Sequence, residues 1–196
     1  MTLFLASTSP RRRELLAQAG IDFTVLNVAV DESQRANELP TAYVERLAKE
    51  KAEAGFLSVV DDDNAVVLAA DTIVVLEDNI LGKPQDKAQA HEMLRSLSGR
   101  SHVVMTAFAI KTHKQMRVQR VNTTVFFRPL TSKEIEWYWQ TGEQLDKAGG
   151  YGIQSKGAIF VSSIAGSYSA VVGLPLAEVV VALRGLGIQA DVLNID

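Results

Sequence analysis

Apolar positions in the first half of the chain follow two patterns. Some fall in short continuous or alternating runs, which predict strands, and others recur every three or four residues, which predicts amphipathic helices. The expected elements, in chain order, are strand 4–6, helix 10–19, strand 23–30, helix 41–54, strand 65–76 and helix 86–97. Because strands and helices alternate, the pattern indicates an α/β protein.

The second half of the chain is richer in strand patterns. Its expected strands are 103–111 and 116–127 around a turn at 113–115, and 158–164 and 168–172 around a turn at 165–166. One helix is predicted from Thr131 to about Gly142, because Glu134 lies at the capping-box position after Thr131, and a second is predicted over 175–184. The chain is long enough for one large domain or two intimate lobes. No Pro-, Gly- or Ser-rich linker divides it, so we expect residues 1–196 to fold as one domain, a long mixed sheet with helices on both faces.

Composition narrows the class of protein. A chain of 196 residues with 47% hydrophobic content can bury about 70% of its unfolded surface. The net charge of −3 argues against nonspecific binding to nucleic acid or to a membrane, since either needs a broad basic field. The sequence has no cysteine and no apolar run near the ~20 residues that span a bilayer. We therefore expect a cytoplasmic protein that binds neither nucleic acid nor membrane.

Positive charge is concentrated at Arg11, Arg12 and Arg13, in the first turn of the helix that Pro10 begins and Ser9 is expected to cap. A helix N-terminus is itself positive, so each added cation costs about 0.3–1 kcal/mol there. One interpretation is a basic turn whose side chains extend into solvent. The other is an anion site, because a strand, a small-residue loop and a helix N-terminus together cradle phosphates.

Asp71 is a carboxylate inside a strand that is apolar on both faces. This pattern is typical of a buried central strand, where an unpaired carboxylate costs several kcal/mol and needs a cation or hydrogen-bond donors. Asp71 could cap backbone N–H groups at the end of the strand, with Thr72 beside it. We favour a metal ligand or a general base.

Two other charged residues, Lys51 and Glu32, are candidates for the same site as Asp71. Lys51 follows Val44 and Leu47 on the inward stripe of its helix, so it either extends past the helix end or points into a cleft with Asp71. Glu32 directly follows a predicted strand, a common place for site carboxylates in α/β proteins, although a solvated loop acid is the simpler interpretation.

Two short motifs supply the remaining candidate functional residues. Lys83 is held between Gly82 and Pro84, a rigid corner that suits a positioned ammonium. The stretch DKAGGYGIQ, residues 146–154, places an acid, a base and three glycines together, so its backbone could approach a ligand closely or form an ordinary flexible turn.

In chain order, these stretches resemble the Maf family of nucleoside triphosphate pyrophosphatases. The matching motifs are LASTSPRRRELL, VDES, ERLAKEKA, AADTIVV, GKP, MLRSLSG, LDKAGGYGIQ and VVGLPL, and they cover nearly the whole chain. The resemblance implies an elongated, two-lobed Maf/Ham1 (inosine-triphosphatase-like) α/β fold with a central cleft, usually as a homodimer. It also implies hydrolysis of a nucleoside triphosphate between its α and β phosphates, with a divalent metal such as Mg, Mn or Co.

The resemblance assigns roles to individual residues. Asp71 matches the proton acceptor, and the other charged active-site positions are Glu32, Lys51 and Lys83. Ser7 and Arg12 match the phosphate-contacting loop, Asp146 and Lys147 are expected to bind substrate, and Glu32 and Asp71 are the candidate metal ligands.

Three positions at which Maf subfamilies differ are Arg11, Thr72 and Gln154 in this chain. This set resembles the subfamily that favours dTTP and UTP, and modified pyrimidine triphosphates are expected as further substrates. A sister subfamily with Trp, Gln and Glu prefers 7-methyl-GTP, whose cationic base suits an aromatic face and a carboxylate. Three alternatives stay open: a 7-methyl-GTP enzyme, a non-enzymatic nucleotide-binding regulator of cell division, and a nucleic-acid-binding protein.

Overall fold

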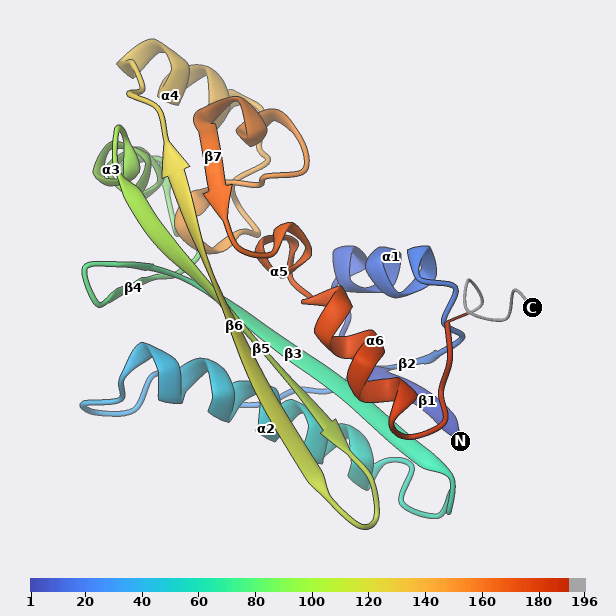
Figure 1. Cartoon of the computed structure of the whole chain (residues 1–196). Helices are drawn as coiled ribbons and strands as arrows, with labels where there is room; N and C mark the ends of the chain where they lie inside the picture. Colours follow the sequence, from blue (N-terminus) through green and yellow to red (C-terminus); the bar gives the residue numbers. More distant parts are fainter. Residues whose placement is uncertain (191–196) are drawn as a thin grey trace. The chain divides into compact units, whose positions relative to one another are not determined.

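The structure is a computed structural model, and it describes residues 1–190 (Figure 1). Within these residues the strands form a seven-stranded mixed sheet in the order β2-β1-β3-β5-β6-β7, with β4 paired to β3. The strands are β1 (Thr2–Ala6), β2 (Thr24–Leu26), β3 (Ala65–Leu76), β4 (Asn79–Leu81), β5 (Ser101–Lys111), β6 (Met116–Phe127) and β7 (Val161–Ala165). The expected α/β class is therefore confirmed.

The helices lie between these strands along the chain. They are α1 (Pro10–Gln18), α2 (Pro40–Leu57), α3 (Lys87–Leu97), α4 (Ser132–Gln140), α5 (Tyr168–Val172) and α6 (Leu176–Arg184), with two 3-10 turns, η1 (Ala148–Gly150) and η2 (Lys156–Phe160). Within residues 1–190, none of the helices has the length and apolarity that a bilayer crossing requires.

The chain divides into two compact units, each made of segments far apart in sequence. Unit 1 comprises residues 1–71, 106–121 and the described residues from 173 onward, and unit 2 comprises residues 72–105 and 122–172. The chain changes unit inside β3, β5 and β6, where no linker separates the units, and once more directly after α5, between Val172 and Gly173.

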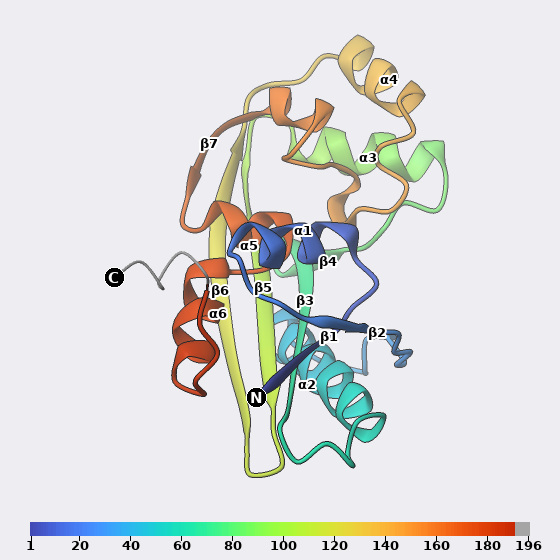
Figure 2. The same cartoon turned by 90° about the vertical axis from the view of Figure 1, so that its right-hand side faces the viewer.

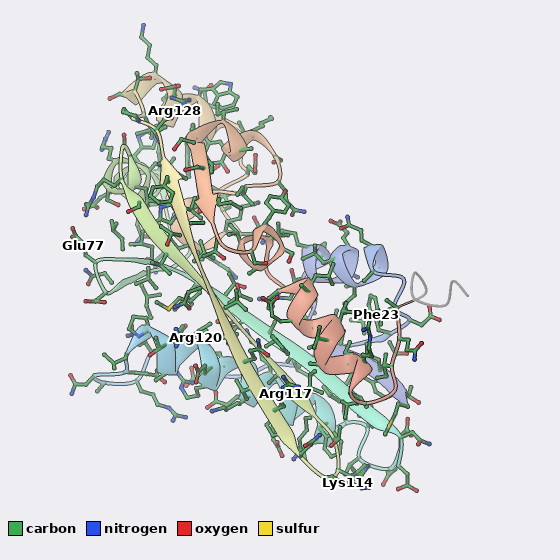
Figure 3. The ribbon with its side chains drawn as sticks, in the orientation of Figure 1. Phe23, Glu77, Lys114, Arg117, Arg120 and Arg128 are labelled. Carbon is green, nitrogen blue, oxygen red and sulfur yellow. The ribbon has the colours of Figure 1, made fainter. Side chains whose placement is uncertain are left out.

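Unit 1 is built on parallel pairing of β1 with both β2 and β3. Figures 1 and 2 show α2 and α6 on opposite faces of this part of the sheet. Gly55 lets α2 approach β1 closely, because a Cβ there would lie only 2.8 Å from the Cβ of Ala6. Ion pairs also connect α2 to the long strands: Arg120, labelled on β6 in Figure 3, lies 3.0 Å from Glu45.

Unit 2 has its own apolar core. Its buried members come from β3, α3, β5, β6, α4 and the loops before β7: Val74, Leu76, Leu94, Leu97, Val104, Val125, Phe127, Ile135, Tyr138, Tyr151 and Phe160. The capping box predicted at Thr131 is present, because Thr131 accepts from the Glu134 N–H and the Glu134 carboxylate accepts from the Thr131 N–H.

One strand prediction is wrong, and two others are longer than the observed strands. Residues 168–172 form helix α5, because the Ser167 hydroxyl accepts from the N–H three residues later and so starts a helical turn. Residues 158–164 begin in η2 and become a strand only at Val161. The strand expected over 23–30 is confined to Thr24–Leu26, since β1 ends at Ala6, the partner of Leu26.

Candidate active site

Lys51 stands between two carboxylates in unit 1. Lys51 Nζ donates to Asp71 Oδ1 at 2.7 Å and lies 2.6 Å from Glu32 Oε1. The side chains of Lys51 and Asp71 are 13% and 11% exposed, whereas that of Glu32 is 55% exposed. Lys51 is thus the cation that the buried carboxylate of β3 requires, and it comes from the inward stripe of α2.

The loop after β1 turns the hydroxyl of Ser7 and the guanidinium of Arg12 toward each other. The buried Ser7 Oγ accepts from the Ser9 N–H at 3.2 Å and from Arg12 Nη1 at 3.4 Å. Ser9 occupies the N-cap position of α1, but its side chain makes no capping bond, which corrects that prediction. Of the arginines, Arg13 is exposed, while Arg11 and Arg12 are partly buried, so the cluster splits between the solvent and the protein interior.

Arg12 is held in place by a residue that the sequence analysis did not single out. Its Nε donates to the carbonyl oxygen of Gly173 at 2.8 Å, and Gly173 has a φ of 137°, a conformation that favours glycine. Burial lowers the pKa of the Arg12 guanidinium, and the negative charges of Asp71 and Glu32 oppose that shift. Arg12 and the two carboxylates therefore share one electrostatic environment in unit 1. In the sequence, the VVGLPL motif, which contains Gly173, was the signal that could have pointed to this residue.

Unit 2 brings the Gly-Lys-Pro corner next to the glycine-rich stretch. The N–H of Gly149 donates to the carbonyl oxygen of Gly82 at 3.0 Å, and Lys83 itself is exposed. The ammonium of Lys147 donates to Asp146 Oδ1 at 2.7 Å and to the Glu143 carbonyl oxygen at 2.6 Å. The Gly-Lys-Pro corner thus presents an exposed lysine, whereas Lys147 is bonded within its own loop.

The predicted specificity residues fall in both units. Arg11 belongs to unit 1, whereas Thr72 and Gln154 belong to unit 2. Thr72 directly follows Asp71 in β3, so one strand carries both side chains, and Gln154 is exposed on the loop between η1 and η2.

The donor set in unit 1 suits a hard divalent cation held together with a substrate. Across residues 1–190, no three His, Cys, Asp or Glu side chains gather in a way that could hold a metal. Glu32 and Asp71 nevertheless bring carboxylate oxygens to within 2.7 Å of one positive group, Lys51 Nζ. Mg²⁺ is commonly bound by one or two carboxylates plus substrate phosphate oxygens, so these residues fit such an ion.

A mixed α/β sheet that sets carboxylates, a lysine and an arginine–serine loop in one unit is typical of enzymes that act on phosphate anhydrides or esters. The chain belongs to the Maf family, since the family model described as Maf-like protein matches residues 2–186.

Several curated relatives share about half of their residues with this chain. A dTTP/UTP pyrophosphatase of Aliivibrio fischeri is 53% identical over 90% of this chain and 93% of the relative. A dTTP/UTP pyrophosphatase of Pectobacterium atrosepticum is 55% identical over 90% of this chain and 88% of the relative. One from Shewanella denitrificans is 50% identical over 98% of this chain and 100% of the relative.

Proposed function

We propose that this protein hydrolyses pyrimidine nucleoside triphosphates, with dTTP and UTP as the best standard substrates. The products are the nucleoside monophosphate and pyrophosphate. The observation that carries the proposal is the buried Asp71, paired with Lys51 and sharing that lysine with Glu32, in a Maf-family chain with relatives named dTTP/UTP pyrophosphatase.

In the proposed reaction, Asp71 accepts a proton from the water that attacks the α phosphorus. A new oxygen–phosphorus bond forms, the bond from the α phosphorus to the bridging oxygen breaks, and pyrophosphate leaves with the electron pair of that bond. Lys51 neutralises negative charge on the phosphates, and Arg12 and Ser7 hold the phosphate chain by charge-assisted and neutral hydrogen bonds.

Glu32 and Asp71 are the residues that would hold a divalent cation such as Mg, Mn or Co. When bound, such an ion neutralises charge on phosphate oxygens. Lys83, Asp146 and Lys147 of unit 2 are proposed as further substrate contacts. The exposed position of Lys83 is compatible with this role.

Base selection is assigned to Arg11, Thr72 and Gln154. A pyrimidine offers acceptors at O2 and O4 and a donor at N3, which a guanidinium and a neutral amide can match. The cationic base of 7-methyl-GTP would instead be repelled by Arg11 and would lack a carboxylate partner. We further propose that the protein acts in the cytoplasm as a homodimer and binds no nucleic acid, the last in keeping with its net charge of −3.

A substrate panel tests the function. Purified protein is assayed for pyrophosphate release from dTTP, UTP, the other standard triphosphates, modified pyrimidine triphosphates and 7-methyl-GTP, with Mg²⁺, Mn²⁺ or Co²⁺ and with chelator. We expect metal-dependent release that is fastest with dTTP and UTP. Preference for 7-methyl-GTP over dTTP would overturn the base assignment alone, and no pyrophosphate from any triphosphate would overturn the enzymatic function in favour of a binding role.

A further inference from the structure

Glu32 lies in the irregular loop between β2 and α2, and two side chains of α2 hold the backbone around it. The hydroxyl of Tyr43 donates to the carbonyl oxygen of Glu32 at 2.7 Å. Arg46 Nη2 donates to the carbonyl oxygen of the next residue, Ser33, at 3.0 Å. Consecutive peptide groups on the C-terminal side of the Glu32 side chain are therefore bonded to one helix.

Arg46 is itself fixed on several sides. Its Nε and Nη2 form a bidentate pair with Glu38, at 2.6 and 2.8 Å, and its Nη1 lies 3.0 Å from Glu50 Oε2. The side chains of Arg46 and Glu38 are only 12% and 9% exposed. The hydrogen bond from Arg46 lowers the pKa of Glu38 to about 2, so this pair remains ionised at neutral pH. A planar guanidinium held this way is a rigid donor rather than a mobile surface charge.

The same helix also holds the carboxylate of Glu32. Lys51 follows Tyr43 by two turns of α2, a rise of about 12 Å, and its Nζ lies 2.6 Å from Glu32 Oε1. The face of α2 that includes Val44, Leu47 and Ala48 is buried, which anchors the helix in unit 1. The backbone and the side chain of Glu32 are thus both bonded to residues of one helix, α2.

We propose that Tyr43 and Arg46 are positioning residues that set the Glu32 carboxylate at Lys51 and Asp71. They act through Glu32 and need no contact with the substrate. The inference rests on the proposed function, because Glu32 affects turnover only if it belongs to the site. These two bonds fix the backbone at Glu32 itself, and a half-exposed ion pair with a lysine contributes little to positioning a loop carboxylate.

The test compares Tyr43→Phe and Arg46→Lys with a matched control, Arg35→Lys. Arg35 belongs to the same ion network through Glu50, but its side chain is 67% exposed and has no bond to the backbone at Glu32 or Ser33. Each variant is measured for kcat and KM with dTTP, for Tm, and for binding of Mn²⁺ together with α,β-imido-dUTP by electron paramagnetic resonance. Each substitution is repeated in a Glu32→Gln background.

We expect Tyr43→Phe to lower kcat/KM about 5-fold, the effect of one hydrogen bond, and Arg46→Lys about 10-fold. Mn²⁺ binding in the presence of the analogue should weaken by similar factors. Arg35→Lys should leave both measurements unchanged. Tyr43→Phe should melt within the range set by that control, whereas Arg46→Lys, which loses the bidentate pair with Glu38, should melt lower. In the Glu32→Gln background, neither substitution should cause a further loss beyond about 2-fold.

Other outcomes separate the two hypotheses. If Glu32→Gln abolishes turnover but Tyr43→Phe and Arg46→Lys keep normal turnover and Mn²⁺ binding, the positioning role is wrong and the site stands. Losses that persist in full in the Glu32→Gln background also refute positioning, because they do not act through Glu32. Full turnover in Glu32→Gln removes Glu32 from the site and overturns the positioning role, while the proposed hydrolysis of the triphosphate stands. If the wild type releases no pyrophosphate, the proposed function fails, and the Mn²⁺ measurements alone decide the positioning role.

Discussion

Replacing Lys51 by methionine removes the ammonium that two carboxylates share and keeps most of the length and volume of the side chain. Asp71 Oδ1 lies 2.7 Å from the ammonium nitrogen, and Glu32 Oε1 lies 2.6 Å from it. Removing one partner of a buried ion pair costs about 3–5 kcal/mol, because the remaining charge stays buried without a counter-ion.

That range is too high for this site, for two reasons. Glu32 is 55% exposed, so water screens most of its interaction with Lys51. Arg12 also faces the negative charge of Asp71 and supplies part of the compensation. We therefore expect Lys51→Met to lower the free energy of unfolding by about 2–3 kcal/mol, chiefly through Asp71. In a chain of this size, the corresponding fall in Tm is roughly 4–12 °C.

Urea unfolding and thermal melts at pH 7 measure this difference. The matched control is Lys49→Met, which removes an exposed lysine from the same helix. Adding Asp71→Asn to Lys51→Met should restore at least about 1 kcal/mol of the free energy of unfolding that Lys51→Met loses, because the buried negative charge is then gone as well. The reasoning is refuted if Lys51→Met costs no more than Lys49→Met, or if the double variant is as unstable as the sum of the single variants.

Four further results are expected. Asp71→Asn should lower kcat at least ~100-fold while equilibrium binding of a nucleotide analogue is retained, and near-normal turnover would refute the general base. Lys83→Ala should raise KM for dTTP and slow hydrolysis at unchanged Tm, and unchanged constants would place Lys83 outside the site. Arg11→Trp combined with Gln154→Glu should raise kcat/KM for 7-methyl-GTP relative to dTTP, whereas an unchanged ratio would locate base selection elsewhere. Burial lowers the pKa of His102 from 6.5 to about 4, so the folded state disfavours its protonation. Its contribution to the free energy of unfolding is therefore present above pH 6.5 and is lost as the pH falls toward 4. Unfolding measured across this range should show a loss of about 3 kcal/mol that is absent in His102→Phe.

Sequence alone determined the elements whose stability is local. The strand over 65–76 was predicted with its observed bounds, because ten of its twelve residues are apolar and the run is typical of a strand buried on both faces. The start of α4 followed from the Thr131 capping box, whose bonds involve residues only three positions apart. The inward register of Lys51 followed from helical periodicity, and Asp71 stood out because a charge in a buried strand is costly.

Tertiary structure decided what depends on partners distant in sequence. The β-branched residues of 168–172 favour a strand, yet Ser167, tied to Thr123 in β6, starts a helix there. Arg12 is oriented by the Gly173 carbonyl, 161 positions away, and no local pattern encodes that bond. Glu32 was a plausible loop acid in the sequence, but only the folded chain shows it meeting Lys51, because the lysine lies 19 positions further on, in α2, the helix that also bonds to the loop of Glu32.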